Sequence, residues 1–335
     1  MSLQKVKLGS HGLIVPTIGL GCMGMTTIAG NDIYGKADEN ESIATIHRSL
    51  ELGGNFLDTA DLYGPLLNER LVGKAIQGNR NSYIIATKFG YEIDDNEQLT
   101  WRINGQKDYV KKAVERSLKN LGTDYIDLYY LHRLDPNTPI EETVGAMADL
   151  VKEGKIGYIG LSEVGSETLI KAHAVHPITA LQTEYSLFER SVEEDGILKT
   201  VKTLGIGFVP YSPLGRGFIS GDIKTPDDFP KNDFRRGIPK FQGDQFYKNI
   251  ELLNELNKLA AEKNITPSQL ALAWAINKGF VPIPGTKRIK YIEQNSAAAT
   301  IELTTEEMNR LESIIPLGTS TGDRYDAAGM QMVSL

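Results

Sequence analysis

Four polar residues of this chain have the types and spacing of a proton-transfer site. Asp58 and Tyr63 lie within residues 55–64, and Lys88 and His132 each follow an apolar run further along. A lysine near the Tyr63 hydroxyl would stabilise the phenolate and lower a pKa that starts near ~10. Asp58 would hold Lys88 in place and keep it charged, and His132 could orient a carbonyl oxygen. Together they would form a general acid for a carbonyl group that accepts hydride.

Each of these residues also has an ordinary interpretation. A lysine that follows a strand is usually a solvated surface charge, and a single histidine is often a satisfied structural one. Sequence distance does not show proximity, so the four positions form a site only if the fold brings them together. The elements that carry them therefore decide between the two interpretations.

Hydrophobic runs predict short buried strands that open into polar loops at these positions. Phe56 and Leu57 lead directly into Asp58, and the polar run to Gly64 is typical of a loop. Counted from Thr17, the chain contains eight predicted strands, each followed by a predicted helix. The strands are expected at 17–21, within 55–64, and at 83–87, 125–131, 156–161, 179–181, 206–210 and 280–283.

Eight strand–helix units in roughly 300 residues match an α/β fold of the (β/α)8 TIM-barrel type. A β-hairpin over 6–15 precedes them, and loops, including a polar loop over 90–106 and a long loop over 212–244, are expected over the C-terminal face. A doubly wound sheet is the alternative. The barrel is favoured because strand ends that share one face would carry Asp58, Lys88, His132, Ser162, Gln182 and Tyr211. No linker of biased composition divides the chain, so a single domain over 1–335 is expected.

Composition excludes several classes of protein. The net charge is −7, from 36 basic and 43 acidic residues, which disfavours a general nucleic-acid binder or a membrane-surface protein. No apolar run approaches the ~20 residues of a membrane span, and residues 1–7 contain no signal core. The single cysteine, Cys22, allows no internal disulfide. A cytoplasmic protein without a metal site is the expectation.

A glycine motif, Gly19-x-Gly21-x-x-Gly24, matches the dinucleotide fingerprint. That fingerprint requires a helix to open directly at the glycines, so that its amides meet a pyrophosphate. Here a glycine-rich loop follows instead. The favoured interpretation is a strand end whose glycines need positive φ.

A second motif follows the last predicted strand, at Gly285, Thr286, Lys287 and Arg288. In a barrel, the loops after strands seven and eight commonly form a phosphate site. Backbone amides and two cations suit a phosphate, and a second phosphate on a ribose would explain two cations. A solvated basic turn is the alternative.

The order and spacing of several motifs resemble the aldo-keto reductase family from end to end. The motifs are GLGCMGM (19–25), FLDTA (56–60) with YG (63–64), ATKFG (86–90), DLYYLH (127–132), GLS (160–162), YSPLGRG (211–217) and IPGTK (283–287). The stretches HRLDP (132–136) and GDRY (322–325) are most similar to the branch that contains perakine reductase and pyridoxal reductase.

This resemblance implies an NADP-dependent oxidoreductase in which NADPH reduces an aldehyde or ketone to an alcohol by hydride transfer. It implies a catalytic tetrad of Asp58, Tyr63, Lys88 and His132, with Tyr63 as the proton donor. It also implies that Ser162 and Gln182 hold the nicotinamide amide, that Tyr211 stacks on the nicotinamide ring, and that the segment 212–216 lines the pyrophosphate. Lys287 and Arg288 would meet the 2′-phosphate, and Gln294 and Asn295 the adenine. These cofactor-binding residues are Ser162, Gln182, Tyr211, Ser212, Leu214, Arg216, Gly285, Thr286, Lys287, Arg288, Gln294 and Asn295.

Two departures from the family pattern leave cofactor contacts open. Many members have Asn where this chain has Glu163, and Glu where it has Gln294. Two other functions remain as alternatives: a nucleotide-sensing regulatory subunit of the same fold, and a barrel glycosidase that uses carboxylates such as Asp58 and Glu184. The expected partner is a small carbonyl compound, and the chain is expected to be a monomer or a homo-oligomer.

Overall fold

The computed structural model describes residues 2–28, 30–32, 34–231, 233–320 and 322–333. Seven parallel strands form its central sheet, hydrogen-bonded in the order β13-β12-β11-β10-β7-β6-β3. Chain order follows spatial order, as in a barrel wound strand by strand. The strands are β3 (Leu20–Gly21), β6 (Phe56–Asp58), β7 (Ile84–Phe89), β10 (Ile126–Leu131), β11 (Ile156–Ser162), β12 (Ala180–Glu184) and β13 (Gly207–Tyr211).

The segment 281–284 closes this sheet although it is not a regular strand. Val281 and Ile283 donate backbone hydrogen bonds to β13 over 3.2 and 3.0 Å. On the opposite side, the carbonyls of Pro282 and Pro284 accept backbone hydrogen bonds from the β3 region over 3.0 and 3.2 Å. Proline has no N–H, so the reciprocal bonds toward β3 cannot form. The predicted eighth strand therefore completes a (β/α)8 barrel through a partial ladder.

Close packing explains the glycines of the first barrel strand. A Cβ on Gly21 would lie 2.8 Å from the carbonyl oxygen of Ile283, and one on Gly19 would lie 2.7 Å from the Phe56 ring. Neither glycine has positive φ, so the expectation of a left-handed conformation was wrong. The 3-10 turn η1 (Met23–Met25) follows these glycines in place of a helix. The glycine motif is therefore not a dinucleotide-binding fingerprint, because that fingerprint requires a helix to begin at the glycines.

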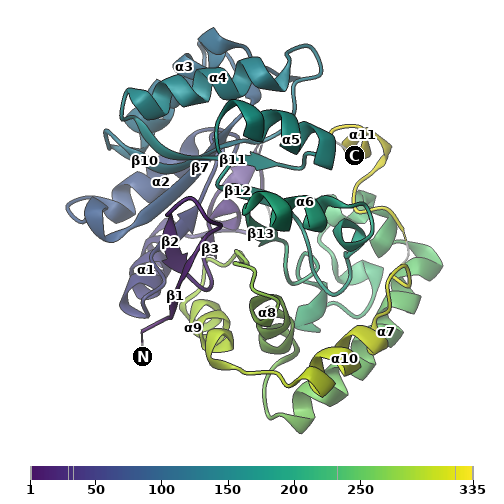
Figure 1. Cartoon of the computed structure of the whole chain (residues 1–335). Coiled ribbons are helices and arrows are strands. Elements are labelled where there is room, and N and C mark those ends of the chain that lie inside the picture. Colours follow the sequence, from purple (N-terminus) through teal and green to yellow (C-terminus); the bar gives the residue numbers. More distant parts are fainter. Residues whose placement is uncertain (1, 29, 33, 232, 321, 334–335) are drawn as a thin grey trace.

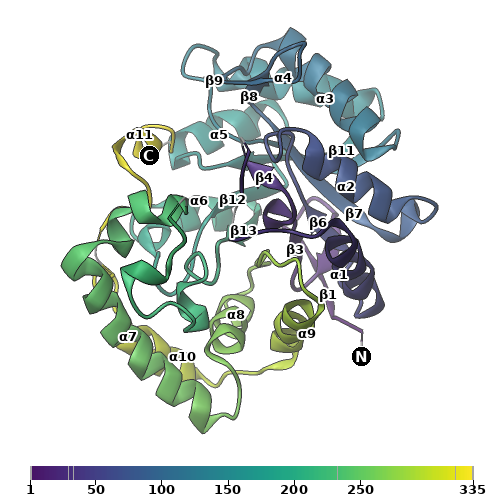
Figure 2. The same cartoon turned by 180° about the vertical axis from the view of Figure 1, so that it is seen from behind.

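Helices surround the barrel, as Figures 1 and 2 show from opposite sides. Helices follow every strand of the barrel, as predicted. They are α1 (Glu39–Glu51), α2 (Leu67–Ile76), α3 (Lys107–Leu121), α4 (Ile140–Lys152), α5 (Ser166–Val175), α6 (Ile197–Leu204), α7 (Gly243–Glu262), α8 (Pro267–Asn277), α9 (Ile289–Ala297) and α10 (Thr305–Ile314). In the described part of the chain, none of these helices is long and apolar enough to cross a membrane.

The start of α8 illustrates how local sequence sets a helix end. Thr266 accepts a hydrogen bond from the Gln269 amide at 3.1 Å, and the Gln269 side chain accepts one from the Thr266 amide at 3.0 Å. This capping box satisfies two amides that have no partner inside the helix. Pro267 occupies the first helical position, where its missing N–H has no cost.

The predicted N-terminal hairpin, β1 (Lys5–Lys7) and β2 (Ile14–Pro16), covers one end of the barrel in front of the strands in Figure 1. Its residues Leu8, Leu13 and Val15 belong to the same buried cluster as the side chains that fill the barrel interior. The hairpin therefore closes the N-terminal end, which leaves the opposite face for a site.

The loops at the C-terminal face contain more structure than the sequence predicted. The expected polar loop 90–106 forms an antiparallel hairpin, β8 (Tyr91–Ile93) with β9 (Leu99–Ile103), in which Tyr91 and Ile93 are buried. The other short elements of these loops and of the tail are β4 (Thr27–Ile28), β5 (Asn31–Asp32), η3 (Ser191–Glu193), η4 (Phe218–Ser220), η5 (Pro226–Asp228), η6 (Phe234–Gly237), η7 (Pro239–Phe241) and α11 (Ala327–Met330).

Gly160→Ala is expected to destabilise the barrel. In β11, the added Cβ would lie 2.4 Å from the buried ring of Tyr130, and overpacking of this kind costs roughly 1–3 kcal/mol. Gly145→Ala is the matched control, because a Cβ there in α4 would meet nothing within 4 Å. That change should raise stability by about 0.4–1 kcal/mol. Urea unfolding measures both, and equal midpoints would contradict the packing argument.

Candidate active site

The ends of β6 and β7 bring three of the four predicted catalytic residues together. The Lys88 ammonium is fully buried and donates to Asp58 Oδ1 at 2.5 Å, to the Thr59 carbonyl at 2.9 Å and to the Tyr63 hydroxyl at 3.4 Å. A cation thus joins a carboxylate to a phenol inside the protein. This is the arrangement that the sequence hypothesis required.

Burial dominates the protonation of Tyr63. It raises the pKa of Tyr63 above its ordinary value, although the neighbouring Lys88 acts to lower it. The expected net lowering of the Tyr63 pKa was therefore wrong, because burial destabilises the phenolate by more than the neighbouring ammonium stabilises it. Burial also favours a neutral Lys88, but Asp58 and Tyr63 raise the pKa of Lys88 above its ordinary value. At neutral pH the site holds a protonated phenol beside a charged lysine.

His132, the fourth predicted residue, follows β10 and lies edge-on to Tyr63. Their ring centroids are 6.0 Å apart with an interplanar angle of 84°. Burial, together with Arg133 and Lys88, holds the pKa of His132 well below its ordinary value. Its Nδ1 atom is buried, and no described residue is its hydrogen-bond partner. His132 is therefore a neutral imidazole with hydrogen-bonding capacity left over.

Two residues predicted to hold the nicotinamide, Ser162 and Gln182, lie at the ends of the next two strands. The Gln182 amide donates to Asp58 Oδ2 at 2.8 Å, so both oxygens of Asp58 are hydrogen-bonded. The Ser162 hydroxyl accepts from Arg133 at 3.3 Å. The sequence hypothesis missed both contacts. Gln182 and Asp58 are 124 residues apart, so only the parallel alignment of strand ends could have indicated their contact.

The loop after β13 carries four more predicted residues. Tyr211 is half-buried at the end of the strand, Leu214 packs partly against the core, and Ser212 and Arg216 are left-handed, with φ of 49° and 57°. The Arg216 side chain is buried and makes two hydrogen bonds to Glu184, at 3.0 and 2.6 Å. Its contact with a pyrophosphate stays a prediction.

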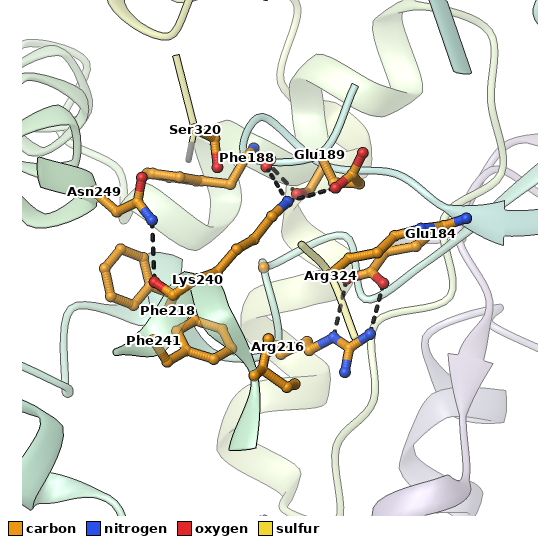
Figure 3. A pocket seen from close by; sticks show the side chains of 13 residues that line it. Glu184, Phe188, Glu189, Arg216, Phe218, Lys240, Phe241, Asn249, Ser320 and Arg324 are labelled. Atoms are coloured by element: carbon orange, nitrogen blue, oxygen red, sulfur yellow. Dashed lines mark hydrogen bonds and ion pairs between the residues drawn. The ribbon is translucent and has the colours of Figure 1, made fainter. Parts of the chain in front are cut away.

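Figure 3 shows the cavity that borders this Arg216–Glu184 pair. Lys240, which binds Glu189 and the Phe188 carbonyl, lines the same cavity. The volume of the cavity, about 20 Å³, leaves room for little more than one water molecule. The long loop is therefore packed closely against the segment that follows β12.

The motif at 285–288 lies between the closing segment of the barrel and the N-terminus of α9. Gly285 and Arg288 are exposed, and the Thr286 hydroxyl accepts from the Arg288 amide at 3.1 Å. Lys287 is mostly buried and donates to the carbonyl of Gly35, which ties the motif to the loop before α1. An exposed cation at a helix N-terminus is a suitable partner for an anion.

The last two predicted cofactor residues, Gln294 and Asn295, lie on α9. Gln294 is half-buried and its backbone carbonyl accepts from Gln269 at 3.3 Å. Asn295 is buried. They lie on the helix that begins at the basic motif, whereas the tetrad lies at the ends of β6, β7 and β10. The predicted residues thus spread along one face of the barrel.

Asp61, close to Asp58 in sequence, belongs to a different cluster. Its carboxylate lies 3.1 Å from Arg116 and is fully buried. Burial and the nearby Glu69 raise the pKa of Asp61 to about 8, although Arg116 acts against them. Its backbone amide donates to the Lys88 carbonyl at 3.0 Å. Asp61 therefore supports β7 from outside the tetrad.

Two features indicate the class of protein to which this chain belongs. They are the closed barrel and, at its strand ends, the hydrogen-bonded Asp58–Lys88–Tyr63 chain beside a neutral histidine. Residues 17–316 match the family model described as "Aldo/keto reductase family". The chain belongs to this family. Its assignment to one branch stays a prediction.

Curated relatives and solved structures cover almost the whole chain. It is 43% identical to aldo-keto reductase yakc (NADP(+)) of Schizosaccharomyces pombe, with 97% of this chain and 95% of that protein aligned. It is 44% identical to aldo-keto reductase str7 of Strobilurus tenacellus, with 99% and 98% aligned. Glycerol dehydrogenase of Gluconobacter oxydans superposes with a TM-score of 0.85 at 27% identity, with 96% and 98% covered. An aldo-keto reductase of Bacillus halodurans in its holo form superposes with 0.76 at 29% identity, also with 96% and 98% covered.

Proposed function

We propose that this protein reduces aldehydes or ketones to alcohols, with NADPH as the hydride donor and Tyr63 as the general acid. The observation that carries the proposal is the buried hydrogen-bonded chain Asp58–Lys88–Tyr63 beside a neutral His132. Membership of the aldo/keto reductase family supports the reaction class. The printed name of the fission-yeast relative, which includes NADP(+), supports the cofactor.

The residues at the C-terminal face fit such a cofactor. His132, whose Nδ1 has no hydrogen-bond partner among the described residues, and the half-buried Tyr211 would lie at the nicotinamide end. Arg288 is an exposed cation at the N-terminus of α9, which suits a 2′-phosphate, and Gln294 and Asn295 follow on the same helix for the adenine. Lys287 would join Arg288 by releasing or sharing its bond to Gly35.

NADPH supplies the hydride when it is bound. The protein's own residues do the remaining work on the carbonyl oxygen. Tyr63 and the neutral His132 stabilise the oxyanion that develops there, and Tyr63 delivers its proton. Lys88 stabilises the phenolate left behind, which burial would otherwise disfavour. Asp58, held by Gln182 on its other oxygen, keeps Lys88 aimed at Tyr63.

Two alternative functions fit the geometry less well. A glycosidase would need free carboxylates, but Asp58 is bonded to Lys88 and Gln182, and Glu184 is bonded twice to Arg216. A regulatory subunit that only senses nucleotide would not need the Lys88–Tyr63 contact. Tight NADPH binding without turnover would nevertheless favour that second function.

An NADPH-oxidation screen over aldehydes and ketones tests the proposal, with NADH as the comparison. The panel should include pyridoxal, quinones and diketones, because the mouth of the barrel is formed by loops whose specificity the sequence does not reveal. Absorbance of the reduced nicotinamide would fall with at least one carbonyl and faster with NADPH than with NADH. Absence of both NADPH binding and turnover would reject the proposal.

The reduction rate should show no titration between about pH 6 and 9. Tyr63 must be protonated to act as an acid, and burial raises its pKa above the ordinary ~10. The rate should therefore fall only at higher pH. His132, whose pKa is held well below its ordinary value, stays neutral throughout and contributes no step. A pH profile of kcat with an inflection near 7 would contradict this prediction.

A further inference from the structure

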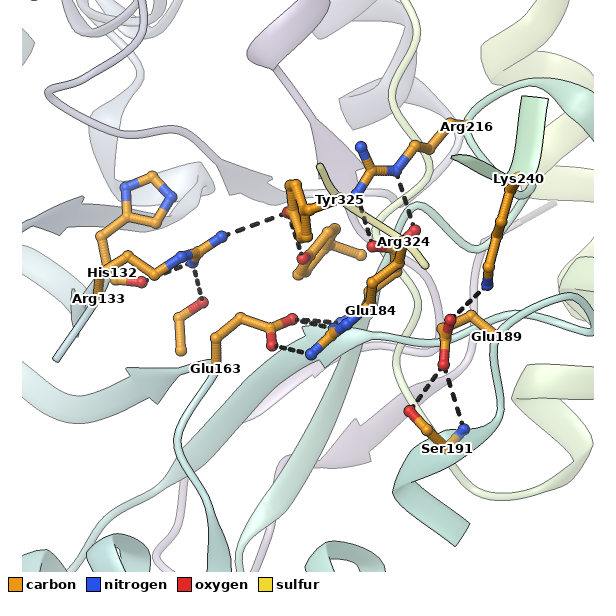
Figure 4. A network of polar contacts seen from close by, with 12 residues as sticks. His132, Arg133, Glu163, Glu184, Glu189, Ser191, Arg216, Lys240, Arg324 and Tyr325 are labelled. Atoms are coloured by element: carbon orange, nitrogen blue, oxygen red, sulfur yellow. Dashed lines mark hydrogen bonds and ion pairs between the residues drawn. The ribbon is translucent and has the colours of Figure 1, made fainter. Parts of the chain in front are cut away.

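The C-terminal residues 322–326 are tied to the end of β11 by a buried ion pair. Both terminal nitrogens of Arg324 donate to the carboxylate of Glu163, at 2.7 and 2.6 Å. The two side chains are only 9% and 1% exposed. Figure 4 shows them meeting through two parallel hydrogen bonds, although 161 residues separate them in sequence. Such a bidentate pair fixes direction as well as distance.

Tyr325, the next residue, reaches the candidate active site itself. Its hydroxyl lies 2.7 Å from that of Tyr211 and accepts from Arg133 at 3.3 Å. The Arg216 guanidinium lies 4.4 Å from the centroid of its ring. Tyr325 is therefore held on three sides. One of its contacts is Tyr211, the side chain proposed to stack on the nicotinamide.

Arg133 continues this connection to the predicted catalytic histidine. It donates to the His132 carbonyl at 2.7 Å and to the Ser162 hydroxyl at 3.3 Å, while its other terminal nitrogen holds Tyr325. Figure 4 shows Arg133 lying between His132 and Tyr325. The tail is thus linked to the strand ends that carry the site.

Glu163 is fully engaged by these contacts. Besides Arg324, its Oε1 accepts from the backbone amide of Glu184 at 2.9 Å. Burial acts to raise the pKa of Glu163, but Arg324 and Arg133 hold it below its ordinary value, so the carboxylate is ionised. Its backbone is left-handed, with φ of 56°, which is unusual for a residue other than glycine. With three hydrogen bonds accepted and only 1% of its side chain exposed, the Glu163 carboxylate offers the nicotinamide carboxamide little access.

We propose that Glu163 and Arg324 form a latch that holds Tyr325 against Tyr211 and Arg133. The latch makes the C-terminal segment a positioning element of the active site. Glu163, which stands where many family members have Asn, serves the tail in this chain rather than the cofactor's carboxamide. The positioning role rests on the proposed function, whereas the latch itself does not.

Glu163→Gln tests the latch with the full chain. Gln keeps the size of the side chain and an acceptor for the Glu184 amide, but it removes the charge that Arg324 requires. Glu167→Gln is the matched control, because Glu167 pairs with Lys171 at 2.7 Å on α5 and its side chain is 84% exposed. Hydrogen–deuterium exchange of residues 322–333 should rise roughly tenfold or more in Glu163→Gln only, since charged hydrogen bonds are lost.

Tyr325→Phe tests the positioning role separately, because it removes only the hydroxyl that meets Tyr211 and Arg133. Both this variant and Glu163→Gln should lower kcat/KM for NADPH on the order of tenfold to a hundredfold, as small misplacements of reacting groups do. Fluorescence of bound NADPH should change as well, which a purely structural defect would not produce. Tyr247→Phe, at an exposed position on α7, should change neither quantity.

Unchanged tail exchange in Glu163→Gln would overturn the latch. A second outcome would overturn the positioning role: raised hydrogen–deuterium exchange of residues 322–333 in Glu163→Gln, together with wild-type kcat/KM for NADPH in both Glu163→Gln and Tyr325→Phe. The latch would then hold the tail without affecting the site. If the wild-type protein neither binds nor oxidises NADPH, the proposed function fails and the positioning role falls with it. The exchange measurement needs no cofactor, so it decides the latch in that case also.

Discussion

Replacing Tyr63 with phenylalanine is expected to lower kcat by about 100-fold to 10,000-fold, the usual contribution of a general acid. The hydroxyl lies 3.4 Å from the Lys88 ammonium, and phenylalanine has no proton to deliver from that position. Binding of NADPH should stay close to that of the wild-type protein, because the ring and its packing are kept. Stopped-flow turnover and fluorescence titration with NADPH measure the two quantities.

Tyr91→Phe is the matched control for this change. Tyr91 is also buried, belongs to the same apolar cluster as Tyr63 and lies edge-on to His132 at 5.4 Å. Its hydroxyl contacts only the Met332 sulfur, at 3.9 Å, among the described side chains. Its loss should therefore leave kcat nearly unchanged. A Tyr63→Phe protein with wild-type turnover would remove Tyr63 from the mechanism, whatever the control shows.

Lys88→Met should cost both stability and turnover. Methionine matches the unbranched lysine stem, but the change leaves the buried Asp58 carboxylate without its cation. Breaking a buried pair by removing one partner costs roughly 3–5 kcal/mol. Turnover should also fall, because the phenolate that forms at Tyr63 loses its nearest cation and keeps only the smaller stabilising influence of Arg133. Urea unfolding and the NADPH assay report the two effects separately.

The double variant Asp58→Asn, Lys88→Met separates these two effects. It leaves no unpaired charge at positions 58 and 88, and the introduced asparagine keeps an oxygen that can accept from Gln182. Stability should return to near the wild-type value, since buried pairs can often be replaced at little cost. Turnover should stay low because the ammonium is still absent. A double variant that regains activity along with stability would assign Lys88 a structural role only.

The order and type of the elements could be predicted from local sequence. Helices such as α8 carry their own capping residues, and short apolar runs bounded by glycine or polar residues mark the strands. The four tetrad positions were recognisable because each lies at the end of a strand or in the loop that follows it, and parallel strands of a barrel end on one face. The hairpin β8–β9 was missed because β9 does not alternate: Trp101 and Arg102 are both exposed, and Trp101 is left-handed with φ of 63°.

Contacts between distant strands needed the closed barrel. Two prolines weaken the ladder of the eighth strand, so its pairing depends on Gly19 and Gly21 letting the backbones approach. Gln182 reaches Asp58, and Arg324 reaches Glu163, across more than a hundred residues. No local pattern encodes such pairs, because their proximity is set by the register of strands around the barrel.

The protonation of the site also depended on tertiary structure. Residue types and spacing were enough to propose that Lys88 adjusts the pKa of Tyr63, and this direction of its influence holds. The net shift is opposite, because desolvation depends on how completely the surrounding chain excludes water. The sequence therefore determined which groups are candidates for the chemistry and on which elements they lie. The closed fold decided how deeply they are buried, which partners they keep, and that the C-terminal tail joins them.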